Sequence, residues 1–225
     1  MRSRGIIIAI DGVVGAGKTA TAKLVAEHLG YRHIDTGAMY RAFTLAATRG
    51  DVNPGDLPAL QTLLAKLTID LQLHEQGGRV LLNEEDVSEE IRRLEINRKV
   101  GSYANIPRVR RALVAEQQRM GLAGGIVAEG RDMATVVFPD AELKIHMFAE
   151  LAERVDRRHR EMMEKGVSIS KDQLRADIEA RDIEDAERDY GVTNFDAQVT
   201  EIDTTAMTLE GQVEHIVELA RKNGA

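Results

Sequence analysis

Apolar residues follow two spacings along this chain, and the change between them predicts where strands and helices lie. Short apolar runs rich in β-branched residues are typical of strands buried in a parallel sheet. Such strands are expected at 6–10, 31–35, 125–129, 143–148 and 199–203. Helical spacing, together with start and stop signals, predicts helices at 19–29, 38–48, 57–67, 89–101, 108–120, 150–165 and 209–222. A capping box at 170–173 predicts a further helix from 171 to about 189. Since strands and helices alternate almost throughout, the pattern predicts an α/β fold with a parallel sheet covered on both faces.

One segment departs from this alternation. Ile69, Leu71 and Leu73 alternate with polar residues, which predicts a half-buried strand. A glycine-rich turn follows, and a second short apolar run leads the chain back, which indicates an antiparallel β-hairpin. We therefore expect residues 64–95 to form a small insert on the main domain.

The stretch from Gly12 to Thr19 reads GVVGAGKT and fits the phosphate-binding P-loop pattern G-x-x-x-x-G-K-[ST]. It lies between an expected strand and an expected helix, as the mechanism of phosphate binding requires. In this pattern the lysine reaches the β- and γ-phosphates and the hydroxyl of the last residue binds magnesium. The expected nucleotide-binding residues are Gly12, Val13, Val14, Gly15, Ala16, Gly17, Lys18, Thr19 and Ala20, with Thr19 as the metal ligand.

Composition restricts the classes of function. The chain has 225 residues, of which 43% are hydrophobic, and this is enough for one sizeable core. A formal net charge of -7 argues against a general nucleic-acid-binding surface. The absence of cysteine excludes disulfides and thiolate zinc sites and fits a reducing compartment. No apolar run approaches the roughly 20 residues of a membrane span, so we expect a cytoplasmic protein.

Polar residues follow the second expected strand, at the edge where open α/β sheets bind ligands. Tyr40 and Arg41 lie one helical turn beyond the segment 35–37, which reads DTG. The planar guanidinium of Arg41 can bind a phosphate with two parallel hydrogen bonds. The alternative is an arginine that only faces solvent, and this pattern alone does not decide between them.

Arg131 and Asp132 follow another strand end, after Gly130. They either belong to a ligand site or form an ordinary local ion pair. Arg181, Asp185 and Arg188 share one face of an expected helix that has few apolar residues. Such a face is typically a salt-bridged surface, which the pattern favours, although weakly held helices also serve as lids over phosphates.

Six segments, taken together and in order, closely resemble the bacterial cytidylate kinases. They read GVVGAGKT at 12–19, DTGAMYR at 35–41, DVS at 86–88, PRVR at 107–110, GRDMATVVFPDA at 130–141 and RDIEDAER at 181–188. The resemblance implies a P-loop kinase core at 1–63 and 96–225, a lid at about 155–190, and an acceptor-nucleotide-binding insert at 64–95. It also implies ATP as phosphoryl donor, magnesium as cofactor, and CMP or dCMP as acceptor.

The resemblance assigns roles residue by residue. Lys18, Arg131 and Arg188 are the expected catalytic residues, and Arg157 is expected near the donor phosphates. The acceptor site would include residues that read the cytosine (Thr36, Arg110, Asp132), hold the CMP phosphate (Arg41, Arg131, Arg188), face the ribose (Arg181, Asp185) or pack nearby (Tyr40). Gly101 stands where the family often has a serine, and Ser102 follows it, so both are included among the acceptor-binding candidates.

Three other classes of protein compete with this interpretation. The nearest is a P-loop kinase with another small acceptor, such as UMP, AMP or shikimate. A nucleotide-dependent switch protein would carry guanine-recognition motifs, and no convincing pair of them is present. A nucleic-acid-binding ATPase is disfavoured by the acidic balance. No exposed apolar stripe stands out, which favours a monomer.

Overall fold

The computed structural model describes residues 2–72, 78–164, 166–187 and 198–225. The chain divides into two compact units. One comprises Met1–Arg32 and Ala123–Ala225, and the other is His33–Leu122. Each unit is described by itself below.

The first unit contains the P-loop and most of the main sheet. Its elements are β1 (Ile7–Gly12), α1 (Lys18–Leu29), β6 (Ile126–Glu129), the π-helical turn η2 (Met133–Val137), β7 (Leu143–Phe148), α6 (Leu151–Glu164), α7 (Lys171–Glu187), β8 (Val199–Asp203) and α8 (Leu209–Lys222). Among the described residues, a five-stranded sheet has the order β2-β6-β1-β7-β8, with β2 at Arg32–Asp35. Strand β1 pairs in parallel with β6 on one side and β7 on the other, so the P-loop leaves the centre of the sheet.

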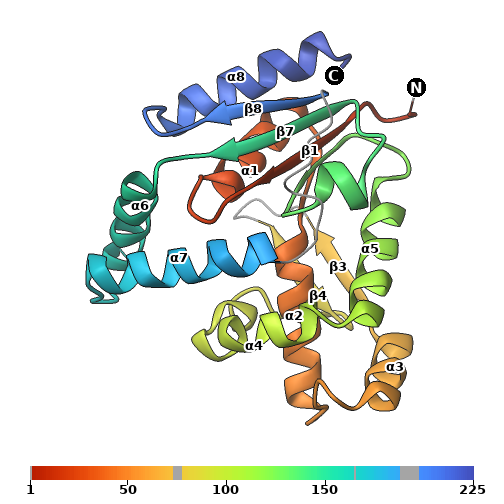
Figure 1. The fold of residues 1–225 in the computed structure, drawn as a ribbon. Coiled ribbons are helices and arrows are strands. Elements are labelled where there is room, and N and C mark those ends of the chain that lie inside the picture. Colours follow the sequence, from red (N-terminus) through yellow and green to blue (C-terminus); the bar gives the residue numbers. More distant parts are fainter. Residues whose placement is uncertain (1, 73–77, 165, 188–197) are drawn as a thin grey trace. The chain divides into compact units, whose positions relative to one another are not determined.

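Helices α1 and α8 cover one face of this sheet (Figure 1). Ile8 and Ile10 of β1 and Ile145 of β7 are fully buried against apolar residues of the two helices, such as Val25 and Ile216. Near-continuous apolar strands are expected where a parallel sheet is covered by helices. The core therefore holds β1 firmly at the point where the P-loop begins.

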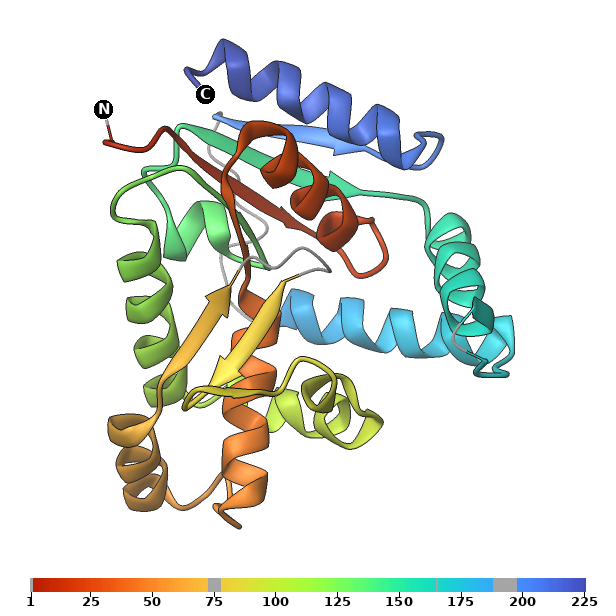
Figure 2. The same cartoon turned by 180° about the vertical axis from the view of Figure 1, so that it is seen from behind.

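The second unit is built around α2 (Thr36–Arg49). Its other elements are α3 (Leu57–Lys66), β3 (Ile69–Gln72), β4 (Arg79–Leu82), β5 (Glu85–Asp86), the 3-10 turn η1 (Glu90–Arg92), α4 (Leu94–Ala104) and α5 (Pro107–Gly121). Strands β3 and β4 lie beside α2 (Figure 2). The Tyr103 ring of α4 meets the Phe43 ring of α2 edge to face at 6.1 Å, and its hydroxyl donates to the Val52 carbonyl at 2.7 Å.

Most predicted elements are confirmed to within a few residues, including the strands at 143–148 and 199–203 and the helix at 209–222. The antiparallel pairing of β3 and β4 confirms the hairpin, and β5 adds a strand that the pattern does not predict. The last residues of the helix expected to run to about 189 lie outside the described residues, which in this stretch end at 187.

Two local structures differ from the sequence-based expectation. The helix expected at 89–101 is interrupted, because Arg93 adopts an extended conformation (φ −60°, ψ 148°) between η1 and α4. The turn η2 was not predicted, since its five residues are too few to show a helical period. The unit His33–Leu122 is larger than the expected insert 64–95, and that insert stays a prediction.

Candidate functional site

The P-loop connects β1 to α1 through three glycines with positive φ. Gly12 (φ 149°) lies so close to β7 that an added Cβ would stand 2.0 Å from the Met147 carbonyl oxygen. Gly17 (φ 93°) takes the left-handed conformation at the start of α1, which side chains disfavour. The loop therefore needs glycine where the motif places it. The first N–H groups of an α-helix have no partner within the helix, so the start of α1 suits a phosphate.

The Lys18 ammonium lies inside this loop. Its Nζ donates to the carbonyl oxygens of Gly12 and Val13, each at 2.8 Å. Burial and the neighbouring Arg131 lower the pKa of Lys18 to about 8, against the opposing effects of Glu129 and Asp11. The lysine ammonium is thus hydrogen bonded to backbone carbonyls. Phosphate oxygens can take the place of these carbonyls as its partners.

Thr19, the expected magnesium ligand, is paired with a carboxylate from the adjacent strand. Its Oγ1 donates to Glu129 Oε2 at 2.9 Å, and Glu129 ends β6 with only 4% of its surface exposed. A hydroxyl and a carboxylate side by side are oxygen donors of the kind that magnesium prefers. These residues fit the cofactor. Among the described residues, no group of three or more His, Cys, Asp or Glu side chains is placed to hold a metal ion.

Arg131 and Asp132 follow Glu129 at the same edge of the sheet. The Asp11 carboxylate of β1 accepts hydrogen bonds from the next two backbone N–H groups, those of Met133 (2.7 Å) and Ala134 (2.8 Å). Asp132 is buried, and Arg131 is a third exposed. Arg131 forms an ion pair with Asp185 of α7, so its partners extend beyond its own strand end.

Helix α7 turns two carboxylates toward the arginines around the P-loop. Asp185 forms an ion pair with Arg131, and Asp182 pairs with Arg154 of α6 at 2.8 Å. Arg154 is buried and also donates to the Val14 carbonyl oxygen at 3.1 Å. The sequence pattern of α7 favours ion pairs exposed to solvent. The structure instead pairs two of its carboxylates with arginines of other elements, one of which is buried.

The other predicted residues of this helix are placed differently. Arg181 is exposed on α7. Arg188 lies outside the described residues, so its expected role stays a prediction.

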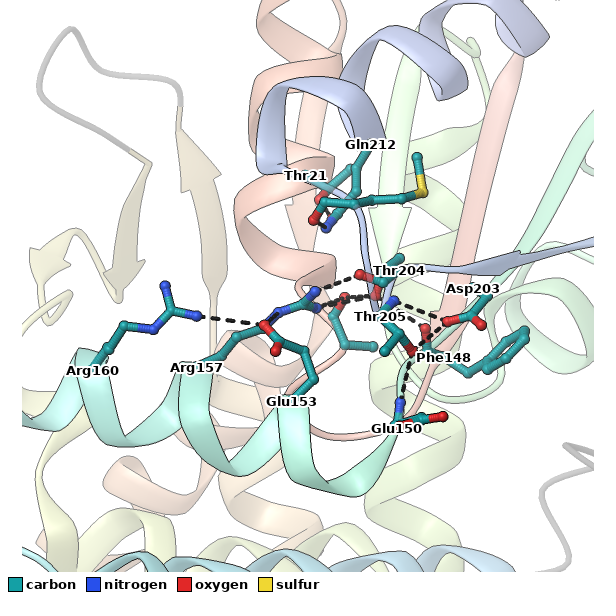
Figure 3. Close-up of polar contacts among 12 residues, drawn as sticks. Thr21, Phe148, Glu150, Glu153, Arg157, Arg160, Asp203, Thr204, Thr205 and Gln212 are labelled. Carbon is teal, nitrogen blue, oxygen red and sulfur yellow. Dashed lines mark hydrogen bonds and ion pairs between the residues drawn. The ribbon is translucent and has the colours of Figure 1, made fainter.

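Arg157 of α6 belongs to a second network at the back of the P-loop (Figure 3). Its guanidinium donates to the Thr204 carbonyl oxygen, to Thr204 Oγ1 (3.1 Å) and to the Ala16 carbonyl oxygen (3.4 Å). The buried Thr204 hydroxyl lies 3.0 Å from both the Ala16 and the Phe148 carbonyl oxygens. Arg157 therefore lies against the P-loop backbone, where a residue near the donor nucleotide is expected.

The expected acceptor residues of the second unit lie on three helices. At the start of α2, Asp35 Oδ1 accepts from the Ala38 N–H at 2.8 Å and its Oδ2 pairs with Arg41 at 3.2 Å. Arg41 is therefore oriented by a carboxylate rather than only facing solvent. The remaining candidates are Thr36, which is buried, and Tyr40 on α2, Gly101 and the exposed Ser102 on α4, and Arg110 on α5.

The cytidylate kinase model matches residues 8–222, which is nearly the whole chain. The chain belongs to the cytidylate kinase family. A cytidylate kinase of Pelodictyon phaeoclathratiforme is 44% identical over 96% of this chain and 95% of its own length. A cytidylate kinase of Streptococcus uberis is 39% identical over 97% of each. Both relatives support an enzyme of the nucleoside monophosphate kinase class.

A solved structure of a distant relative supports the fold. The gluconokinase of Sinorhizobium meliloti 1021 aligns over 99% of this chain and 94% of its own with a TM-score of 0.52 at 14% identity. Among the described helices of this family member, none has the length and apolar character to cross a membrane.

Sequence reasoning missed two carboxylates of the candidate site, Asp11 and Glu129. Each is a charged residue at the end of an apolar strand, which is the one signal that the sequence offers. Their partners are more than one hundred positions away, so the spacing of residues could not reveal the contacts.

Proposed function

We propose that this member of the cytidylate kinase family transfers the γ-phosphoryl group of ATP to the 5′-phosphate of CMP or dCMP, giving CDP or dCDP and ADP. The observation that carries the proposal is the group of cations in the first unit. Lys18 lies within the P-loop, with Arg131 and Arg154 near enough to lower its pKa. A site that gathers this much positive charge is built for phosphate groups.

The acceptor needs no general base. The second pKa of a phosphate monoester is about 6, so its oxygens are already largely ionised near neutral pH. Rate enhancement then comes from in-line positioning and from neutralising charge on the phosphates. Lys18 would hold the donor phosphates, while Arg131, Arg41 and Arg188 would hold the acceptor phosphate.

Magnesium would be held by Thr19 and by Glu129, directly or through water. When bound, the ion neutralises the donor phosphates. Glu129 would orient the Thr19 hydroxyl, since the two are already hydrogen bonded at 2.9 Å. Arg157, beside the Ala16 carbonyl, would support the same side of the donor site.

Asp132 would distinguish cytosine from uracil. The exocyclic amine of cytosine donates a hydrogen bond, whereas uracil presents an acceptor there and would be repelled by a carboxylate. A site built around a buried hydrogen bond can reject the wrong partner by large factors. Thr36 and Arg110 would share in reading the base, and Gly101 and Ser102 are further candidates for binding the acceptor. Tyr40 would pack against the nucleotide, and Arg181 and Asp185 would face the ribose.

The test is a coupled assay of ADP release with ATP, with and without magnesium, and a panel of CMP, dCMP, UMP, AMP and GMP. Turnover with CMP and dCMP far above the others, and only with magnesium, is the expected result. Equal turnover with UMP would support kinase activity but contradict the role of Asp132 in reading the base. Turnover with none of them would point to another small acceptor or to a switch protein. A monomeric state and a cytoplasmic location stay predictions, and sedimentation analysis tests the first.

A further inference from the structure

Asp11 is the charged residue inside the β1 strand, one position before the first P-loop glycine. It is 1% exposed, and its backbone is paired in register with His146 of β7. A carboxylate is costly to bury unless it is hydrogen bonded or paired. Its partners therefore indicate what it does.

Both Asp11 oxygens accept from consecutive backbone N–H groups. Oδ1 accepts from Met133 at 2.7 Å, and Oδ2 accepts from Ala134 at 2.8 Å. These two residues begin the π-helical turn η2, whose own first N–H groups have no partner within the turn. Asp11 thus serves as the cap of a turn that lies 122 residues further along the chain.

The segment between β6 and η2 is held to β1 at both of its ends. Before it, the Gly130 N–H donates to the Ile10 carbonyl oxygen at 3.0 Å. After it, the N–H groups of Met133 and Ala134 are bound by Asp11. Only Arg131 and Asp132 lie between these two attachments. They are the residues expected to bind the acceptor phosphate and to read the base.

The pKa of Asp11 is raised overall, because burial outweighs the neighbouring groups that favour the ionised form. Burial raises the pKa of Asp11, whereas the two N–H groups, Lys18 and Arg131 oppose that rise. Hydrogen bonds from two backbone N–H groups and two nearby cations stabilise a carboxylate. An amide at this position would offer only one acceptor oxygen, and its NH₂ group would face an N–H.

We propose that Asp11 is a positioning residue that fixes Arg131 and Asp132 for acceptor recognition, while the P-loop that follows it binds the donor. This inference rests on the proposed function, since it assigns Asp11 to the acceptor half of that reaction. Asp11 itself touches no substrate. Loss of its carboxylate removes the hydrogen bonds that hold the start of η2. Arg131 and Asp132, which directly precede η2, are then no longer held in fixed positions.

The experiment compares Asp11→Asn with Glu142→Gln. Glu142 also accepts a backbone N–H of β1, that of Ile7 at 2.9 Å, but at the opposite end of the strand. Losing a charge-assisted hydrogen bond and leaving a buried N–H unpaired is expected to raise KM for CMP by roughly 10- to 100-fold in Asp11→Asn. The CMP-over-UMP ratio of kcat/KM should fall about tenfold and KM for ATP should change by less than about threefold. Glu142→Gln should leave all three near wild type.

Two outcomes would overturn the inference. If Asp11→Asn raises KM for ATP and leaves KM for CMP unchanged, Asp11 acts on Lys18 instead. If a folded variant, checked by circular dichroism and thermal unfolding, keeps both KM values and the base preference, Asp11 positions nothing. Should Asp11→Asn not fold, Asp11→Ser keeps one acceptor and is assayed in the same way. A second failure to fold would make Asp11 a folding determinant and overturn the positioning role.

Failure of the proposed function would be visible separately. Wild-type protein without CMP turnover contradicts the function itself, whereas an unchanged variant-to-wild-type ratio contradicts only the role of Asp11.

Discussion

Asp11 and Asp35 occupy similar places in the two units, yet they act over different distances in sequence. Each lies at or next to the end of a strand, accepts from a backbone N–H at the start of a helix or turn, and has an arginine near it. Asp35 caps its own helix three residues away and pairs with Arg41 six residues away. Asp11 caps a turn 122 residues away.

The difference shows in what each carboxylate needs. Asp35 is about one-fifth exposed, and one of its oxygens caps the helix while the other pairs with Arg41. An asparagine can keep the cap, because its single oxygen is enough for one N–H. Asp11 is buried, and both of its oxygens are used by backbone N–H groups. Asp35, whose contacts are local in sequence, should therefore tolerate replacement by asparagine. Asp11, whose contacts are distant in sequence, should not.

The largest expected effect comes from the arginine that Asp11 helps to place. Arg131→Lys keeps the charge but loses the planar fork, so kcat/KM for CMP should fall by roughly 10- to 100-fold. Arg41→Lys should cost less than Arg131→Lys, because Arg41 is paired locally with Asp35, the residue that caps its own helix. Steady-state kinetics with saturating ATP measures both. Arg119→Lys, at an exposed pair with Glu116, is the control. Equal losses at Arg131 and Arg41 would contradict the ranking.

Asp132→Asn should change base preference more than rate. An amide can donate to uracil as well as accept from cytosine, so the CMP-over-UMP ratio of kcat/KM should fall by about tenfold. The ratio is measured with both acceptors under the same conditions. An unchanged ratio would remove Asp132 from base reading and, with it, the reason for Asp11 to affect specificity.

Substitutions at Asp35 distinguish its role in capping α2 from its role as the partner of Arg41. Asp35→Ala should lower the free energy of unfolding by about 1 kcal/mol, because α2 loses its cap. Asp35→Asn should keep stability within a few tenths of a kcal/mol while raising KM for CMP a few-fold, since Arg41 loses its charged partner. Denaturant unfolding and acceptor kinetics measure the two effects.

Asp56, which caps α3 by accepting from the Ala59 N–H at 3.0 Å, gives the matched control for Asp35. Asp56→Ala should lose stability with no change in KM for CMP. If Asp35→Asn destabilises the protein as much as Asp35→Ala does, the distinction between cap and partner fails.

The smallest expected effect is a dependence on pH at Lys18. Its pKa is lowered to about 8 in the free enzyme, mainly by burial and then by Arg131. Lys18 is therefore mostly charged at pH 7 and loses its charge as pH rises through about 8. Because kcat/KM reports the free enzyme, kcat/KM for ATP at pH 8.5 should be roughly a quarter of its plateau value. A flat profile to pH 9.5 would show that Lys18 stays charged.

Local patterns explain why much of this molecule could be predicted. The strand at 143–148 and the helix at 209–222 follow from apolar spacing. The P-loop follows from glycines at positions whose backbone conformation other residues disfavour. The cap of α2 is also a local contact. By contrast, the break at Arg93 and the short strand β5 carry no periodic signal, because each involves too few residues.

The sequence by itself determined the α/β class, the P-loop with Lys18 and Thr19, and the positions of Arg131 and Asp132 at a strand end. These features depend on the spacing of residues a few positions apart. Such spacing determines which side chains are buried and which backbone conformations are allowed. Only the tertiary structure decided that Glu129 meets Thr19, that Asp185 meets Arg131 and that Asp11 holds η2. Those contacts join residues that become neighbours when parallel strands align and helices pack on them, and the order of strands in a sheet is set by the packing of the whole chain.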